Sequence, residues 1–200
     1  MKSIDKITNL SSNTTINLQG KLISLQKPLI MGVLNLTKDS FYDGGRYINN
    51  VEKALIHAKE MIEDGADIID IGACSTRPNA ILVSEEEELE QIIPVVREIR
   101  KAFPDIIISI DTFWANVAEK AVKEGANIIN DISGGQFDPK LFEVLPSLNA
   151  PYILTHTPNT PDKMPLADHF DLRYRLRRRR KSIGLRTQME ELLFSSLYLF

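Results

Sequence analysis

The sequence predicts an α/β protein built on a parallel β-sheet, and three observations carry that prediction. Short apolar runs of strand length alternate with segments whose apolar residues recur at helical spacing. The phrase EDGADIIDIG is nearly repeated as KEGANIINDI, and each describes a helix end, a glycine and a buried strand. Polar residues follow almost every predicted strand. Alternating strands and helices of this kind form parallel sheets with right-handed crossovers.

A β-hairpin is expected first, over residues 14–26. Polar and apolar residues alternate in TTINLQG, and KLISLQK supplies a second apolar set. Gly20 stands between the two segments, where a tight hairpin turn favours glycine. The hairpin therefore precedes the repeating units as a separate element.

Five strands with four helices between them follow the hairpin. The strands are apolar runs typical of strands buried on both faces, predicted at Leu29–Leu34, 67–72, 106–111, 127–131 and 152–156. The helices are predicted at Asn49–Asp64, Ser84–Ala102, Trp114–Lys123 and Pro139–Leu148. Gly65 and Gly125 end two of these helices, and Ser84 with Glu87 forms a capping box at the start of another.

The arrangement of the sheet has two solutions. An open, doubly wound sheet concentrates its ligand groups at one switch point, whereas a (β/α)₈ barrel collects them from every strand end. The polar strand ends here are Asn35, Asp70, Thr76–Arg77, Asp111, Asn130–Asp131 and His156, which favours the barrel. A complete barrel needs about 250 residues. We therefore predict a partial TIM barrel of about five βα units, with Asp131 capping the helix that follows it.

Composition is that of a soluble globular protein. Hydrophobic residues make up 43% of the 200 residues and the net charge is −3. No segment approaches the ~18 consecutive apolar residues of a membrane span, and the first residues lack the apolar core of a signal peptide. Cys74 is the only cysteine, which excludes an intrachain disulfide and suits a reducing compartment. We expect a cytoplasmic protein without a membrane partner.

Four segments carry a resemblance to a known family: MGVLNLTKDSFYDGG, DIGACSTRPNA, ISIDTFWANVAEKAVKEGANIINDISGG and PYILTHTPNTPDKM. From about Pro28 to Met164, their order and spacing resemble those of the dihydropteroate synthases, in the pterin-binding barrel family. The resemblance implies a transferase of folate biosynthesis. Such an enzyme joins 7,8-dihydropterin-6-ylmethyl diphosphate to 4-aminobenzoate and releases diphosphate with the help of Mg²⁺.

Three strand-end residues receive roles from this resemblance. Asn35 would bind Mg²⁺ and the diphosphate, since Mg²⁺ prefers oxygen ligands and often binds through substrate phosphates. Asp111 and Asn130 would bind the pterin ring. The chemistry agrees, because a ring with a row of N–H donors and acceptors needs carboxylate and amide partners.

Two loops receive the remaining roles. Thr76 and Arg77 would contact the substrate, and the guanidinium of Arg77 can hold a diphosphate through two hydrogen bonds. Asp43 would help to close the site around the positive charge that develops on the methylene carbon. Asp43 and Arg77 are therefore the expected catalytic residues. Small-molecule substrates are the expected partners.

The sequence departs from the family pattern in several places. Lys38 stands where the family usually has proline, and Cys74 where many members have glutamate or tyrosine. The later motifs, an Asp-Pro-Gly strand end, a Ser-Arg-Lys segment and a final Arg-x-His, do not occur. We therefore expect weak or no activity from this form. A non-catalytic pterin-binding protein and a methyltetrahydrofolate-dependent methyltransferase remain alternatives, and a homodimer stays open.

The last thirty residues differ from the rest in charge. Residues 1–170 carry 16 Lys and Arg against 24 Asp and Glu, whereas residues 171–200 carry eight against three. We divide the chain accordingly into a pterin-binding partial barrel, 1–170, and an atypical basic tail, 171–200. The tail could serve nucleic acid or form a solvated helix. The abrupt loss of resemblance instead favours a truncated gene product or a shifted reading frame, so nucleic acid is not an expected partner.

Overall fold

A computed structural model describes residues 15–36, 47–73 and 83–155 of the chain. Its strands are β1 Thr15–Leu18, β2 Lys21–Ser24, β3 Met31–Asn35, β4 Ile68–Gly72, β5 Ile107–Asp111, β6 Ile128–Asp131 and β7 Tyr152–Leu154. Its helices are α2 Tyr47–Glu63, α3 Glu85–Ala102, α4 Ala115–Lys123 and α5 Leu141–Leu148. None of these described helices is long and apolar enough to cross a membrane.

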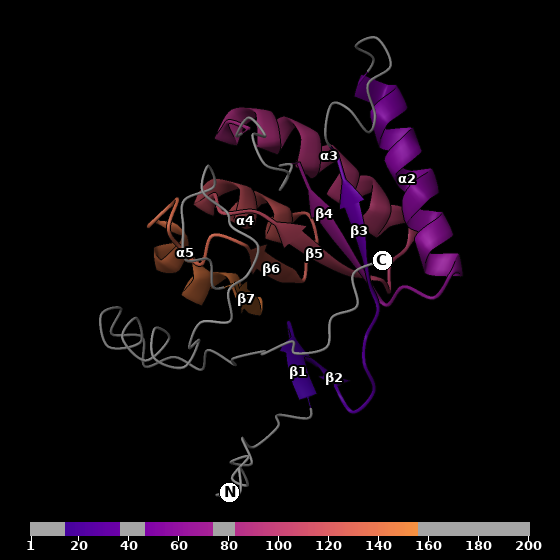
Figure 1. Cartoon of the computed structure of the whole chain (residues 1–200), viewed down its shortest axis with the longest axis horizontal. Helices are drawn as coiled ribbons and strands as arrows, with labels where there is room; N and C mark the ends of the chain where they lie inside the picture. The colour runs from indigo at the N-terminus through magenta and orange to yellow at the C-terminus, as the bar shows by residue number, and fades with distance from the viewer. Residues whose placement is uncertain (1–14, 37–46, 74–82, 156–200) are drawn as a thin grey trace, which may run out of the picture.

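The main sheet is parallel, and its strands lie side by side in chain order, β3-β4-β5-β6-β7. In a doubly wound sheet the order in which successive strands are added reverses at a switch point. No such reversal occurs among these five strands. The helices α2 to α5 lie along one side of the sheet (Figure 1) and share one apolar core with it. This order is that of a (β/α) barrel, so the predicted partial barrel is confirmed.

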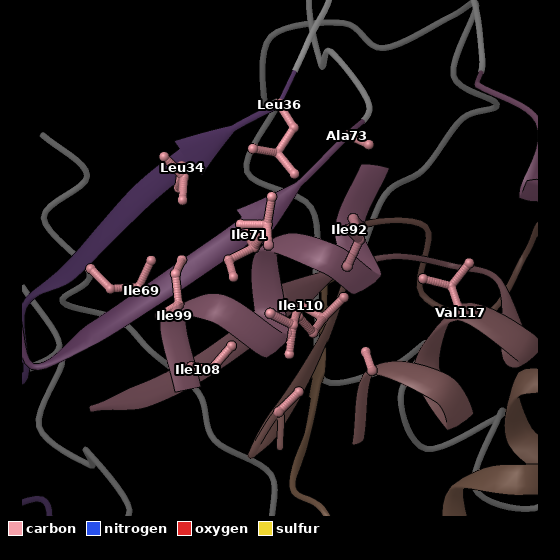
Figure 2. Packing of buried hydrophobic residues seen from close by; sticks show 14 of the residues in the cluster. Leu34, Leu36, Ile69, Ile71, Ala73, Ile92, Ile99, Ile108, Ile110 and Val117 are labelled. Carbon is pink, nitrogen blue, oxygen red and sulfur yellow. The ribbon is translucent and has the colours of Figure 1, made fainter. Parts of the chain in front are cut away.

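The outer face of the sheet forms the main core with the helices. Alternate strand residues supply fully buried isoleucines, among them Ile69 and Ile71 of β4 and Ile108 and Ile110 of β5. These side chains pack with α3 residues such as Ile92 and Ile99, as Figure 2 shows. Because side chains alternate across a strand, the intervening residues must point to the inner face.

The hairpin packs against the beginning of the barrel strands. Ile16 and Leu18 of β1 form a second apolar cluster with the first residues of three strands, Met31, Ile68 and Ile128. Both residues of the two-residue turn have positive φ, 52° at Gln19 and 96° at Gly20, as a type I′ turn requires. Gln19 also donates a hydrogen bond to the carbonyl of Ala126, which ties the turn to the segment before β6.

The helix boundaries agree with the local signals in the sequence. Gly65 and Gly125 lie two residues after the last residues of α2 and α4, and they have positive φ values of 102° and 110°. The capping box of Ser84 and Glu87 is formed at the start of α3. Strand β3 lies two residues later than predicted at its start and includes Asn35, which extends the sheet up to the first predicted site residue.

Candidate functional site

The carboxyl ends of the strands place polar residues in one row across the inner face. The ladder pairs, in order, Asn35, Gly72, Asp111 and Asn130 of β3 to β6. One layer deeper it pairs Val33, Asp70, Ser109 and Ile128. Parallel strands present their carboxyl ends on the same side, which is where barrels bind ligands. The polar residues of the upper row therefore lie next to Asp70 and Ser109, which are one layer deeper.

The deeper layer contains buried polar groups in place of the apolar residues that normally fill a barrel. Asp70 is 4% exposed and Ser109 is fully buried. The amide Nδ2 of Asn130 donates a hydrogen bond of 3.0 Å to Oδ2 of Asp70. The second oxygen of Asp70 is buried and has no hydrogen-bond partner of good geometry within the described part of the chain. Buried polar atoms of this kind need a partner, so the site suits a ligand that carries donors.

Negative charges gather around Asp111. Burial raises the pKa of Asp111 well above its ordinary value, and the carboxylates of Asp70, Glu88 and Asp131 raise it further. Burial also raises the pKa of Asp70, while the polar side chains of Ser109 and Asn130 act in the opposite direction. Strongly raised pKa values in a cluster mark candidate functional sites. The cluster favours ligands rich in N–H donors over anionic groups at this depth.

Asp131 lies beside Asn130 in the chain but faces the other side of the sheet. Its carboxylate accepts hydrogen bonds from the backbone N–H groups of Ser133 and Gly135 and from the hydroxyl of Tyr152. Asp131 thus stabilises the turn after β6. The sequence had predicted that it caps α5, and this prediction was wrong. Asp138 supplies caps in this region, since it accepts from the N–H groups of Ala115 and Lys140.

The structure brings together three of the predicted site residues. Asn35, Asp111 and Asn130 all end strands and lie in one ladder row. Asn35 is exposed, whereas Asp111 and Asn130 are partly buried. The other predicted site residues, Asp43, Thr76 and Arg77, lie outside the described residues, as do Lys38, Cys74, His156 and the tail 171–200.

Three buried polar residues near the site received no role in the sequence analysis: Asp70, which was named only as a polar strand end, Ser109 and Glu88. Glu88 is fully buried in the first turn of α3 and acts on the pKa of Asp111. A signal for the other two was present, because DIIDIG and ISID each carry a polar residue inside an apolar strand. In a strand buried on both faces, such a residue indicates a lined cavity or site.

The described residues contain no group of three or more His, Cys, Asp or Glu side chains that could hold a metal ion. Asn35 nevertheless exposes an amide at the end of β3, and its oxygen is of the type that Mg²⁺ accepts. An ion held by one protein amide and by substrate phosphates needs no protein cage. The residues present therefore fit a Mg²⁺ ion that binds together with a phosphate-bearing substrate.

The chain is similar in sequence to known proteins. A family described as "Pterin binding enzyme" matches residues 31–188. A dihydropteroate synthase of Bacillus subtilis (strain 168) is 54% identical over 138 residues, which cover 69% of this chain and 47% of the relative.

Two solved structures share the fold. A Xanthomonas albilineans dihydropteroate synthase with 4-aminobenzoic acid aligns with a TM-score of 0.72 at 34% identity, over 86% of this chain and 61% of that one. The enzyme from the same organism in complex with 7,8-dihydropteroate aligns with a TM-score of 0.62 at 35% identity, over 72% and 51% of the two chains. The chain spans about half the length of the curated synthases it matches, such as 47% of the Bacillus protein.

Proposed function

The chain belongs to the pterin-binding enzyme family, and from that premise we propose that its inner face is the pterin site of a dihydropteroate synthase. The observation that carries the proposal is the ladder row of Asn35, Asp111 and Asn130 above the buried carboxylate of Asp70. The relatives reported above are named as synthases, which favours this activity over that of a methyltransferase. A cytoplasmic location stays part of the proposal.

The proposed reaction forms a C–N bond and breaks a C–O bond. The neutral amine of 4-aminobenzoate attacks the methylene carbon of the pterin diphosphate, and the C–O bond to the diphosphate breaks. The bond electrons leave with the diphosphate, and the amine releases a proton. No oxidant or reductant is needed. The protein must hold the two substrates in line and stabilise the charges that develop on the methylene carbon and the leaving group.

Asp111 and Asn130 would bind and orient the pterin ring. An ionised carboxylate can only accept hydrogen bonds, whereas an amide both donates and accepts them. The two side chains together can therefore bind a ring that carries both donors and acceptors. Donors from the ring would also compensate the negative charges that raise the pKa of Asp111. Binding at this row would place the ring at the carboxyl ends of the strands, with its substituent directed outward.

Asn35 would hold Mg²⁺ together with the diphosphate, and the ion would neutralise charge on the leaving group. We keep the proposal that Thr76 and Arg77 bind the substrate, that Arg77 pairs with the diphosphate and that Asp43 helps to close the site. These three roles rest on the resemblance in the sequence. The small-molecule substrates are the pterin diphosphate and 4-aminobenzoate.

The first test is pterin binding by the whole 200-residue chain. Titration with 6-hydroxymethylpterin, followed by its own fluorescence, should show saturable binding that Asp111→Ala weakens by a hundredfold or more, equivalent to about 3 kcal/mol. Asp105→Ala is the matched control, because it removes an exposed carboxylate just before β5. Equal binding by wild type and Asp111→Ala would contradict the proposed pterin site.

The second test is turnover. The chain receives the pterin diphosphate, 4-aminobenzoate and Mg²⁺, and diphosphate release is followed, with Asp111→Ala as the control for contaminating host enzyme. An Asn35→Ala variant should need a higher Mg²⁺ concentration for half-maximal rate. Pterin binding without turnover would favour the second candidate, a non-catalytic pterin-binding protein. The observation behind that candidate is that the chain spans about half the length of the synthases it matches.

A further inference from the structure

A hydrogen bond links two strands that are not neighbours in the sheet. Asn130 belongs to β6 and Asp70 to β4, with β5 between them, and Nδ2 of Asn130 lies 3.0 Å from Oδ2 of Asp70. The β5 residue in register with Asp70 is Ser109, which is fully buried. A small side chain at this position lets the longer side chains of the two flanking strands meet above β5.

The partner on β4 decides which end of the Asn130 amide faces it. An asparagine amide carries a donor end and an acceptor end of nearly the same shape, so a neutral surrounding permits both orientations. An ionised carboxylate accepts hydrogen bonds only. A carboxylate at position 70 therefore attracts the NH₂ group and excludes the carbonyl oxygen, which must point elsewhere.

We propose that Asp70 is a positioning residue, which fixes the amide of Asn130 so that its carbonyl oxygen and its second N–H face the ring of a bound pterin. This inference rests on the proposed function, because it deepens the account of the same site. Asp70 acts through Asn130 and contacts no reacting atom. Its effect is on recognition, since a flipped amide would offer the ring a donor where an acceptor is required.

The environment of Asp70 is unlike that of a residue retained for packing alone. Its Oδ1 atom is buried without a hydrogen bond of good geometry in the described ranges, although the hydroxyl of Ser109, in register on β5, lowers the pKa of Asp70 as a hydrogen-bond partner would. A buried carboxylate that served only stability would be expected to have both oxygens satisfied. Two well-placed apolar residues of similar volume would be at least as stabilising as an incompletely satisfied polar pair. Stability alone therefore gives no reason for a carboxylate and an amide at these two positions.

The first experiment observes the amide directly, without a ligand. The full chain is labelled with ¹⁵N-asparagine, and the Asn130 side-chain signal is assigned by its loss in Asn130→Ser. The wild-type signal should show one N–H proton shifted downfield by its bond to the carboxylate, and Asp70→Asn should abolish that shift. Ile129→Val is the matched control, because it changes the neighbouring residue on the outer face and should leave the signal in place. An unchanged signal in Asp70→Asn would overturn the inference.

The second experiment separates positioning from a purely structural role. Asp70→Asn should weaken binding of 6-hydroxymethylpterin about tenfold, equivalent to about 1.4 kcal/mol, while Ile129→Val binds as wild type. Asp70→Asn is also made in the Asn130→Ser background, where no amide remains to be oriented. If Asp70 acts through Asn130, Asp70→Asn should cause no further loss of pterin affinity in that background.

A purely structural role predicts that Asp70→Asn weakens pterin binding by the same factor in the wild-type and the Asn130→Ser backgrounds, and that result would overturn the inference. Absence of pterin binding by the wild-type chain would instead contradict the proposed function. In that case the role of Asp70 in pterin recognition fails as well. The NMR comparison still decides whether Asp70 orients the amide of Asn130. The two failures are therefore distinguishable.

Discussion

The side chain of Asp111 packs directly over Gly72 on the neighbouring strand. A Cβ atom at position 72 would lie 3.2 Å from Cβ and 3.3 Å from Oδ2 of Asp111. The two residues are paired in register across β4 and β5. The position of the Asp111 carboxylate thus depends on the absence of a side chain beside it.

Gly72→Ala should weaken pterin binding about tenfold, because the new methyl group displaces the Asp111 carboxylate by a few tenths of an ångström. Fluorescence titration measures the affinity. Gly32→Ala is the control, since its Cβ would meet the flexible end of Met61 on α2, away from the site. That variant should alter stability without altering affinity. Equal losses of affinity in both variants would show that the contact with Asp111 has no special role.

Asp111→Asn should change how stability depends on pH. The fold raises the pKa of Asp111 above its ordinary value of 3.8, so the folded chain holds this proton more tightly than the unfolded chain. The contribution of Asp111 to stability is then fully present below that ordinary value and is lost as pH rises through the raised pKa. The asparagine variant escapes this loss.

Urea unfolding of wild type and Asp111→Asn between pH 4 and pH 8 provides the measurement. The advantage of the variant in free energy of unfolding should grow with pH, while its pterin binding is lost. Ile129→Val should differ from wild type by a constant amount across the same range. Parallel pH curves for wild type and Asp111→Asn would contradict the raised pKa.

Ile16→Ala should lower the free energy of unfolding by about 2 to 5 kcal/mol, the usual cost of removing a buried isoleucine. Ile16 is 3% exposed between the hairpin and the first residues of the barrel strands. Leu22→Ala, in the same hairpin but 69% exposed, should change stability by less than about 0.5 kcal/mol. Similar losses in the two variants, measured by urea unfolding, would argue against the hairpin as a cover for the barrel end.

Tyr152→Phe should cost about 1.5 to 3 kcal/mol, the usual contribution of a hydrogen bond to a charged group. The tyrosine hydroxyl donates to Oδ2 of Asp131, and the phenylalanine ring can keep the edge-to-face contact with Phe142. The two backbone donors of Asp131 remain in the variant. Thermal and urea unfolding give the loss. A neutral result would mean that those backbone bonds alone hold the turn after β6.

The sequence by itself determined the elements and the ends of the strands. Apolar runs, helical spacing, the glycines at 65 and 125 and the capping box of Ser84 act over a few residues. Strand ends follow from the same local signals, and polar residues at Asn35, Asp111 and Asn130 could therefore be predicted to meet at one end of a parallel sheet. The ladder confirms that they share one row.

The tertiary structure alone decided how residues far apart in the chain fit together. The bond from Asn130 to Asp70 spans 60 residues and crosses β5. It depends on the register of three strands and on the small side chain between them. The contact of Gly72 with Asp111 depends on the same register. Register is a property of paired strands and of the core that they share, so no local pattern in one strand specifies it.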